Sequence, residues 1–433
     1  MAEPKLRFRD EKGGCYQEWN QEKFSDIFTL LGNNTLSRAE LNYDNGVVKN
    51  VHYGDILTKF GSFVDVSTEA LPYISNEAHA EKAMKHSLME GDIVIADTAE
   101  DETVGKTTEI VNLFDTQLVS GLHTIPCRPV KDKFASKFLG YYMNSNAYHK
   151  QLRPLMQGIK VTSISKSAIM DTDISVPETA EQQKIADLLS YVDEVTTLIT
   201  NEIRLWEEKK KGVMQKIFSQ EVRFKDENGE DYPEWEESSI GEIFETITDY
   251  VAAGSFAEIA KNVVYKTEPD YAQLIRTVDI KKDFKDSSPV FVDEKAFHFL
   301  WRVNLDKEYI VMPNIGANIG EIYYVYPQMY PKERNVLGPN AILLGTTTNT
   351  MYWSQYFQSV IFQKQLKLII AASGQPKFNK TELKRIKVYK PTSEEQQKIA
   401  DCLSSIDEVI TIKKQKLETW KNIKKGLLQQ MFV

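Results

Sequence analysis

The chain has 433 residues, of which 42% are hydrophobic and 27% are charged, so it has the composition of a folded protein and a length at which two or more domains are expected. Its formal net charge of −9 is opposite in sign to that of most free-standing nucleic-acid binders. No apolar run is long enough to span a membrane and the first residues lack the apolar core of a signal peptide, so a cytoplasmic location is expected.

A short motif opens the chain and returns near its middle. The segment RFRDEKGGCYQEWNQEKFSDIF at residues 7–28 matches RFKDENGEDYPEWEESSIGEIF at residues 223–244, with 10 of 22 positions identical. A repeat of this length indicates an internal duplication. We assign residues 1–28 to an N-terminal repeat motif, and residues 219–244 to a linker with the second copy of that motif.

Each motif is followed by a stretch of mixed strand and helix character, at residues 29–177 and 245–391. Short apolar runs rich in β-branched and aromatic residues are separated by Gly, Pro and Asn, as in strands that are joined by tight turns. Each stretch is therefore predicted to be an α+β domain, domain 1 and domain 2. The clearest elements are strands at Asp92–Ala96, Tyr309–Met312 and Ile322–Val325 and helical segments at about 135–156 and 349–370.

Two long helices complete the duplicated pattern, at residues 178–218 and 392–433. Residues 181–218 begin with EQQKIAD and match residues 395–432 at 19 of 38 positions without a gap. At 1.5 Å per residue each helix would be roughly 60 Å long. A Thr or Ser three residues before a Gln predicts a capping box at the start of each helix. The predicted pairs are Thr179 with Gln182 and Ser393 with Gln396.

Both long helices carry a seven-residue apolar repeat, which is typical of a coiled-coil seam. A helix of this length is not stable alone with a bare apolar face, so the two copies are expected to pack against each other. The alternative is a helical hairpin arm inside one globular fold. Lys413 is the one break in the second repeat. The predicted seam residues are Ile185, Val192, Ile199 and Trp206 in the first helix and Ile399, Ile406 and Trp420 in the second.

The charge is unevenly distributed along the chain. Residues 178–244 hold 17 acidic and 8 basic residues, so this segment carries the acidity of the whole chain. Residues 128–168 and residues 361–390 each hold eight basic residues against one acidic residue. Two matched basic stretches, interleaved with amides and hydroxyls, are what phosphate contacts and base-edge hydrogen bonds need. The alternative is a solvated lysine-rich surface.

We therefore predict a DNA-contacting surface on each domain, from charge, polarity and position. A lone His123 is more consistent with a core or DNA-facing side chain than with a catalytic one. The predicted DNA-binding residues are His123, Arg153, Lys160, Ser163 and Lys166 in domain 1, and Asn314, Asn318, Gln375, Lys377, Asn379 and Lys380 in domain 2.

No catalytic or metal-binding motif is complete. Residues 105–107 read GKT, like the end of a phosphate-binding loop, but Glu100 stands where that loop needs a glycine. Pro269-Asp270 with residues 293–295 (DEK) fits a nuclease pattern that a chain so rich in charge meets easily. The six histidines form no HxH or HxxxH pair, and the three cysteines form no CxxC pair. Methyl-donor and adenine-flipping motifs are absent too, so no metal and no cofactor is expected.

Over essentially its whole length the chain resembles the specificity subunits of type I restriction-modification systems. The resemblance rests on the two EQQKIAD helices that end in KKG..Q..F, on the RF(R/K)DE...EW motif, and on the segments Gly91–Lys106, Val119–Pro129 and Asn314–Gly320. It implies two target-recognition domains that each read one half of an asymmetric bipartite DNA site. It also implies that the long helices pack antiparallel.

The same resemblance implies partners. Two modification subunits, which are adenine methyltransferases, would dock on the helices, and restriction subunits would join through the complex. S-adenosylmethionine, ATP and Mg would belong to those subunits, so this chain would be non-catalytic. The alternatives are an autonomous nuclease or methyltransferase, and a coiled-coil adaptor that does not bind DNA.

The two long helices end in matching apolar tails, GVMQKIF and GLLQQMF. We predict that these tails form exposed patches that dock the partner subunits. The alternative is that they close the coiled coil itself. The predicted docking residues are Val213, Ile217, Phe218, Leu427, Met431 and Phe432.

Overall fold

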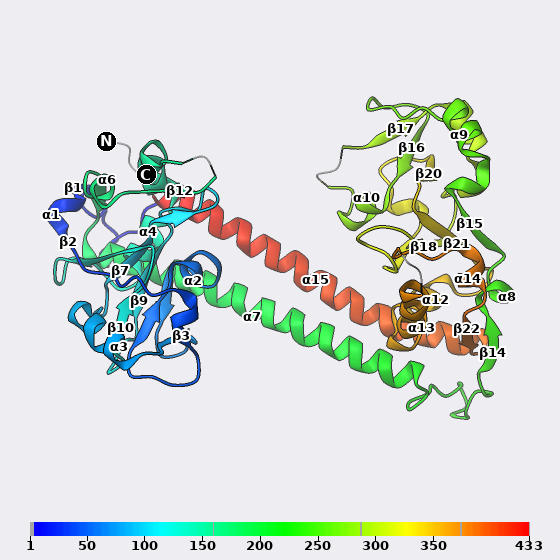
Figure 1. Ribbon diagram of the computed structural model, residues 1–433, viewed down its shortest axis with the longest axis horizontal. Helices are drawn as coiled ribbons and strands as arrows, with labels where there is room; N and C mark the ends of the chain where they lie inside the picture. The colour runs from blue at the N-terminus through cyan, green and yellow to red at the C-terminus, as the bar shows by residue number, and fades with distance from the viewer. Residues whose placement is uncertain (1–3, 159, 286–287, 373–374, 433) are drawn as a thin grey trace. The chain divides into compact units, whose positions relative to one another are not determined.

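The computed structural model describes residues 4–158, 160–285, 288–372 and 375–432, and the chain divides into two compact units (Figure 1). Unit 1 comprises residues 1–201 and 415–433, and unit 2 comprises residues 202–414. Two long helices, α7 (Thr179–Phe218) and α15 (Ser393–Met431), each contribute one half to each unit. Among the described residues, no helix is long and apolar enough to cross a membrane.

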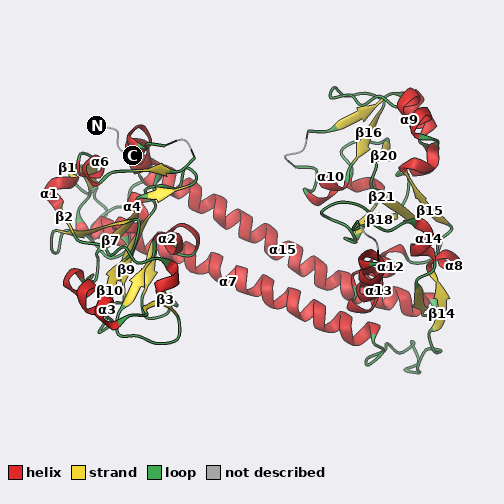
Figure 2. Cartoon of the chain, viewed as in Figure 1, coloured by secondary structure: helices red, strands yellow, loops and turns green. Residues whose placement is uncertain are grey.

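Unit 1 is an α+β domain with short strands and short helices (Figure 2). Its strands are β1 (Asn20–Lys23), β2 (Phe28–Leu30), β3 (Leu41–Asn42), β4 (Lys49–Val51), β5 (Phe63–Asp65), β6 (Tyr73–Ile74), β7 (Ile93–Ala96), β8 (Thr98–Ala99), β9 (Thr107–Val111), β10 (Leu118–Ser120), β11 (Thr124–Pro129), β12 (Thr162–Ser163) and β13 (Asp173–Val176). Its helices are α1 (Phe24–Ile27), α2 (Tyr53–Thr58), α3 (Glu77–Ala83), α4 (Phe138–Met143), α5 (Asn146–Leu152) and α6 (Lys166–Met170), with 3-10 turns η1 (Arg38–Glu40), η2 (Met84–His86) and η3 (Arg153–Leu155).

Unit 2 is also an α+β domain with short strands and short helices. Its strands are β14 (Glu236–Ser239), β15 (Thr246–Asp249), β16 (Ala272–Ile275), β17 (Val290–Val292), β18 (Tyr309–Pro313), β19 (Tyr323–Val325), β20 (Asn335–Leu337), β21 (Ala341–Gly345) and β22 (Lys387–Lys390). Its helices are α8 (Ile240–Ile243), α9 (Phe256–Asn262), α10 (Thr277–Lys281), α11 (Glu294–Phe299), α12 (Thr350–Gln358), α13 (Val360–Ala371) and α14 (Lys380–Lys384), with 3-10 turns η4 (Tyr250–Ala253), η5 (Trp301–Val303) and η6 (Pro327–Met329).

The two units share one topology although their sequences are only faintly similar. The sheet order β2-β11-β7-β9 in unit 1, with β5 added at its edge, corresponds to β15-β21-β18-β19 in unit 2. The parallel pair β4-β10 corresponds to β16-β20, and the antiparallel pair β1-β13 corresponds to β14-β22. The predicted fold class, two α+β domains with two long helices and an internal duplication, is confirmed.

The long helices pack antiparallel within each unit. In unit 1, Lys424 of α15 pairs with Asp193 of α7 at 2.5 Å. In unit 2, Lys210 pairs with Asp407 at 2.7 Å, and the seam-breaking Lys413 pairs with Glu202 at 2.8 Å. A lysine at this break in the apolar seam is therefore matched by an opposite charge.

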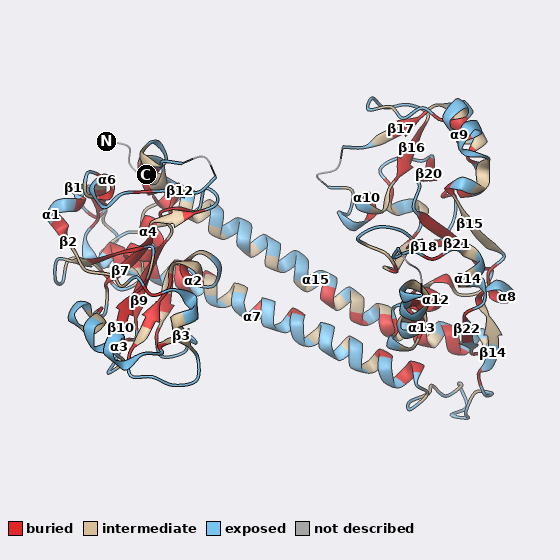
Figure 3. Ribbon diagram, in the orientation of Figure 1, coloured by how far each residue is buried: buried red, intermediate tan, exposed pale blue. Residues whose placement is uncertain are grey.

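The seam is buried most fully where each helix meets its domain, and long faces of both helices remain exposed (Figure 3). The two tryptophans at the predicted seam are only half-buried. Trp420 packs edge-on against Tyr191 in unit 1, and Lys209 lies over the ring of Trp206 in unit 2. The buried seam residues are Ile185, Val192, Ile199, Ile399 and Ile406.

The capping boxes predicted at the helix starts are wrong by one residue, because Thr179 and Ser393 are already the first helical residues. At the second helix, the Thr392 hydroxyl accepts the backbone N–H of Glu395 at 3.3 Å. The following glutamine is turned backward, so that the Gln396 amide donates to the carbonyl of Pro391 at 2.9 Å. Gln182 makes the equivalent bond to Pro177 at 2.8 Å.

The two sequence repeats meet in space at the start of each long helix. In unit 1 the fully buried Glu181 accepts two hydrogen bonds from Arg7, at 3.0 and 2.7 Å, and one from Trp19 Nε1 at 3.1 Å. A buried carboxylate needs such partners, since an unpaired buried charge is strongly destabilising. We call this group the clasp. Its unit 2 copy is formed by Arg223, Trp235 and Glu395.

Candidate nucleic-acid interface

Three chain segments meet in unit 1 to form an exposed surface that we call platform 1, defined by Asp97, Thr98, His123 and Ser163. The backbone N–H of Asp97, just after β7, donates to the His123 carbonyl at 3.1 Å. The Asp97 carbonyl in turn accepts the N–H of Ile164 at 2.9 Å. The side chain of Ile164 is buried and anchors this third segment in the core.

Unit 2 repeats the same backbone connections in platform 2, defined by Asn314, Ile315, Asn340 and Lys377. The N–H of Asn314, just after β18, donates to the Asn340 carbonyl at 3.1 Å, and its carbonyl accepts the N–H of Phe378 at 3.2 Å. Phe378 is buried, like its counterpart in unit 1. The same pair of backbone hydrogen bonds therefore joins three chain segments in both platforms.

One residue in each platform has left-handed backbone geometry. His123, directly before β11, has φ 53°, and Asn340, directly before β21, has φ 69°. Non-glycine residues rarely adopt this region, and Asn and His are among those that tolerate it best. The strained position turns an exposed side chain outward in both platforms.

The loops that bear the platforms close on corresponding glycines. Gly105 (φ 83°) donates its N–H to Ala96 at 2.8 Å, and Gly320 (φ 79°) donates to Pro313 at 2.9 Å. A side chain at Gly105 would collide with Leu152 at 2.6 Å. The GKT segment is thus a turn packed on the core. Burial lowers the pKa of the adjacent Lys106, whose ammonium donates to the Leu57 carbonyl at 3.1 Å.

On platform 1, polar and aromatic groups surround His123. Its Nδ1 lies 3.5 Å from the Asp97 carboxylate and 3.4 Å from the Thr98 hydroxyl, and its ring packs edge-on against Tyr53. Ser163 pairs with Thr98 across the two-stranded β8-β12 ladder. The structure therefore brings together His123 and Ser163, which lie 40 residues apart in the chain.

The other residues predicted in unit 1 are exposed. Lys166 is the first residue of α6, directly after Ser165, whose hydroxyl caps that helix. Arg153 begins η3, and its guanidinium donates to Asn146 Oδ1 at 3.2 Å. Lys160 lies in the turn before β12.

In unit 2 the predicted residues separate into exposed and engaged groups. Gln375 and Lys377 are exposed. Lys380, by contrast, is ion-paired to Asp249 at 2.8 Å, Asn379 caps α14, and the Asn314 amide holds the Phe378 carbonyl at 3.1 Å. Those three side chains already bind partners within the fold, so fewer of their polar atoms are free to contact a nucleic acid.

Asn318 is engaged in a different way, because its Oδ1 accepts a hydrogen bond from Lys281 at 2.8 Å. Lys281 also pairs with Glu321 at 2.7 Å. Neither Lys281 nor Asn340 is among the residues predicted from the sequence. Lys281 lies outside the basic stretch. Asn340 carries no charge, so the only feature of the sequence that could have indicated it is an Asn directly before an apolar strand.

Among the described residues, four of the sixteen basic side chains in the two predicted stretches are ion-paired within the fold: Arg128, Lys133, Lys380 and Lys387. Arg128 makes two hydrogen bonds to the buried Asp92, at 2.9 and 2.7 Å, and Lys133 pairs with Glu22 at 2.5 Å. Counting lysines and arginines along the chain therefore overstates the charge that is free to meet phosphates.

The family described as the type I restriction modification DNA specificity domain matches the chain twice, at residues 16–205 and 232–421. The chain belongs to this type I specificity family. Each match takes in one α+β domain with its platform and most of the long helix that follows.

Relatives of known name support the assignment along the whole chain. The putative type I restriction enzyme MjaX specificity subunit of Methanocaldococcus jannaschii is 23% identical and aligns with 97% of this chain and 94% of its own length. The MjaVIII specificity subunit of the same organism is 24% identical over 64% of this chain and 65% of its own length.

Solved structures share the fold of this specificity-family chain. The type I restriction-modification S subunit from M. genitalium matches with a TM-score of 0.56 at 16% identity, over 100% of this chain and 99% of its own. A chain solved in work on complex assembly and conformational transition of the type I R-M system matches with a TM-score of 0.51 at 14% identity, over 96% of this chain and 98% of its own.

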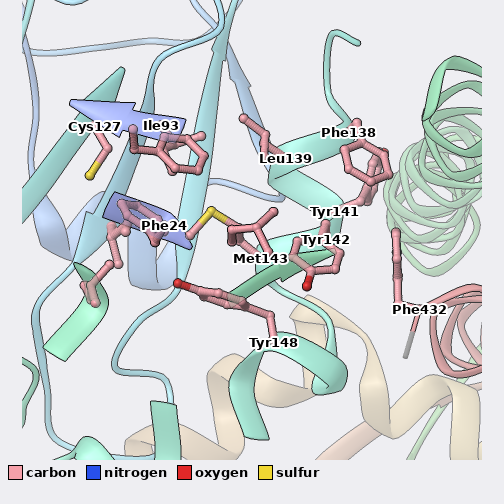
Figure 4. Packing of buried hydrophobic residues seen from close by; sticks show 14 of the residues in the cluster. Phe24, Ile93, Cys127, Phe138, Leu139, Tyr141, Tyr142, Met143, Tyr148 and Phe432 are labelled. Carbon is pink, nitrogen blue, oxygen red and sulfur yellow. The ribbon is translucent and has the colours of Figure 1, made fainter. Parts of the chain in front are cut away.

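The apolar tails of the two helices are not exposed patches, and this expectation of the sequence analysis is corrected. Phe432 packs edge-on against Phe138 and Tyr142 in the core of unit 1 (Figure 4). It also packs edge-on against Trp19. Phe218 packs in the same way against tyrosines of α12 in unit 2. The fully buried tail residues are Ile217, Phe218, Met431 and Phe432, and the half-buried ones are Val213 and Leu427.

Proposed function

We propose that this chain is the non-catalytic DNA-reading subunit of a type I restriction-modification complex. Each unit reads one half of an asymmetric bipartite site, and the helical parts dock two modification subunits, with restriction subunits joining through the complex. S-adenosylmethionine, ATP and Mg then belong to those partners.

One observation carries the DNA-reading part of the proposal: the two platforms keep the same backbone and change the side chains. His123 stands where Asn340 stands in unit 2, and Ser163 stands where Lys377 stands. Hydrogen-bonding side chains on a fixed frame are suited to base edges, and changing them changes the bases that are accepted. Two differently equipped platforms favour two different half-sites.

The residues of the nuclease-like pattern support a non-catalytic chain. Asp270 is ion-paired to Lys266 at 2.5 Å, and Asp293 Oδ1 caps α11 by accepting the N–H of Ala296 at 2.8 Å. Within the described residues, no group of three or more His, Cys, Asp and Glu side chains is placed to hold a metal ion. The proposal therefore assigns the chemistry to the partners.

The test is methyl transfer from labelled S-adenosylmethionine to duplex DNA. We expect no transfer by the purified chain alone, and transfer once the modification subunit of its own system is added, in a complex whose mass fits one specificity chain and two modification chains. Methylation or cleavage of DNA by the purified chain alone would refute the proposal.

A further inference from the structure

Two clefts, one in each unit, are lined by residues that correspond through the internal repeat. The first lies in unit 1, between the last turns of α15 and the turn before α5. The second lies in unit 2, between the last turns of α7 and the turn before α13. The lining residues that matter here are Lys424, Lys425, Leu428, Gln429 and Ser145 in the first cleft, and Lys210, Lys211, Met214, Gln215 and Ser359 in the second.

Some lining residues form the walls of the clefts. Lys424 and Lys210 are neutralised by aspartates of the facing long helix. The hydroxyls of Ser145 and Ser359 cap the short helices that follow them, because they accept the N–H groups of Tyr148 and Phe362. These contacts fix the helix and the turn against each other, so the same cleft forms in both units.

Other lining residues are free to meet a ligand. Lys425 and Gln429 are exposed in the first cleft, as are Lys211 and Gln215 in the second. Within the described part of the chain, neither Lys211 nor Lys425 has an ion-pair partner. Beside them, Leu428 packs on the core of unit 1 and Met214 belongs to the core of unit 2, which gives each cleft an apolar floor.

This combination of groups defines the chemistry of the occupant. An unpaired ammonium and an amide over an apolar floor match a carboxylate next to an apolar side chain. Glu207 lines the second cleft where Lys421 lines the first, but Lys414 pairs with Glu207 at 2.7 Å, so Lys211 still offers the second cleft an unpaired ammonium. The two platforms differ while the two clefts keep their lysines, serine and glutamine, which favours one kind of partner bound twice.

We propose that each cleft docks one modification subunit through an acidic segment that carries an apolar side chain. This inference rests on the proposed function and names the surface that the partner uses. Lys425 and Gln429 hold the partner on unit 1, and Lys211 and Gln215 hold it on unit 2.

The test measures the mass of the complex formed with the modification subunit of the same system. The unaltered chain should bind two copies. Charge reversal by Lys211→Glu or Lys425→Glu should each remove one copy, with affinity at that cleft lowered by about a hundredfold or more, because like charges across an interface cost several kcal/mol. The double variant should bind none. Both lysines are exposed, so thermal unfolding should not change.

Lys416→Glu is the matched control, since Lys416 is an exposed lysine of α15 that does not line the cleft. This variant should still bind two copies. If the double variant also binds two copies, the clefts are not the docking sites, although the proposed function stands. If the double variant keeps both partners but loses affinity for duplex DNA, the clefts bind nucleic acid instead. If the unaltered chain binds no modification subunit, the proposed function itself fails.

Discussion

Two buried glutamates, Glu181 and Glu395, join the short motif to the start of each long helix. Glu181 and Glu395 are buried because an arginine and a tryptophan from the short motif reach each carboxylate. Conspicuous sequence repeats, the RF...EW motif and the EQQKIAD helix, are thereby explained as two halves of one contact. Both repeats are visible in the sequence, but their contact is not, since the contacting residues lie more than 150 positions apart.

Glu109 in β9 gives a prediction about pH. It is buried, and burial raises its pKa from 4.5 to about 7, although the N–H groups of Lys137 and Gly140 donate to its carboxylate. The folded chain therefore holds this proton more tightly than the unfolded chain. Its contribution to the free energy of unfolding is full below pH 4.5 and is lost as the pH rises to about 7, a change of about 3 kcal/mol.

Chemical denaturation of unit 1 between pH 4.5 and 8 measures this dependence. We expect Glu109→Gln to remove the corresponding part of the slope, because glutamine does not titrate. The control is Glu69→Gln, at an exposed glutamate of the same unit, which should follow the parent chain. A Glu109→Gln variant with the parent slope would show that Glu109 stays ionised in the folded chain.

At the scale of elements, the ends of the long helices are parts of the domain cores. The heptad pattern predicted the two helices and the apolar faces through which they pack, because this signal is periodic and local, whereas their antiparallel direction was implied by the family resemblance. It could not predict that Phe218 and Phe432 enter the cores of the α+β domains, since their burial depends on aromatic side chains far away in the sequence, such as Tyr142 and Tyr352.

Phe432→Ala and Phe218→Ala should therefore destabilise unit 1 and unit 2 respectively. Removing a buried Phe from a packed core costs about 3–5 kcal/mol, which thermal or chemical unfolding would detect. Ile423→Ala on α15 is the control, because Ile423 is 42% exposed and its loss should change the free energy of unfolding by less than about 1 kcal/mol. Unchanged stability together with a lost partner subunit would restore the docking role predicted from the sequence.

At the scale of the whole molecule, the chain is one structural plan used twice. Duplication, fold class and the presence of two basic stretches could be predicted from the sequence. His123, Ser163, Asn314 and Lys377 were among the predicted residues, but their assembly into platforms could not be predicted, because each platform joins three distant segments through backbone hydrogen bonds. Lys380 illustrates the limit: its charge suggested DNA contact, and Asp249 neutralises it.

The central claim is that platform 1 and platform 2 read different halves of one DNA site. Genome-wide mapping of methylated adenines in a host that carries the complete system tests it directly, with reciprocal exchanges between the platforms. His123→Asn with Ser163→Lys gives platform 1 two side chains of platform 2. Asn340→His with Lys377→Ser makes the reverse exchange. Each new residue already occupies the corresponding backbone position in the other unit.

The parent should give one bipartite motif. Each exchange should alter the accepted bases in one half of that motif, a different half for each exchange, and leave the other half unchanged, because a mispaired base contact costs about 1–3 kcal/mol only where it is made. An active complex whose motif is the same with both exchanges, or in which one exchange alters both halves, would contradict the account.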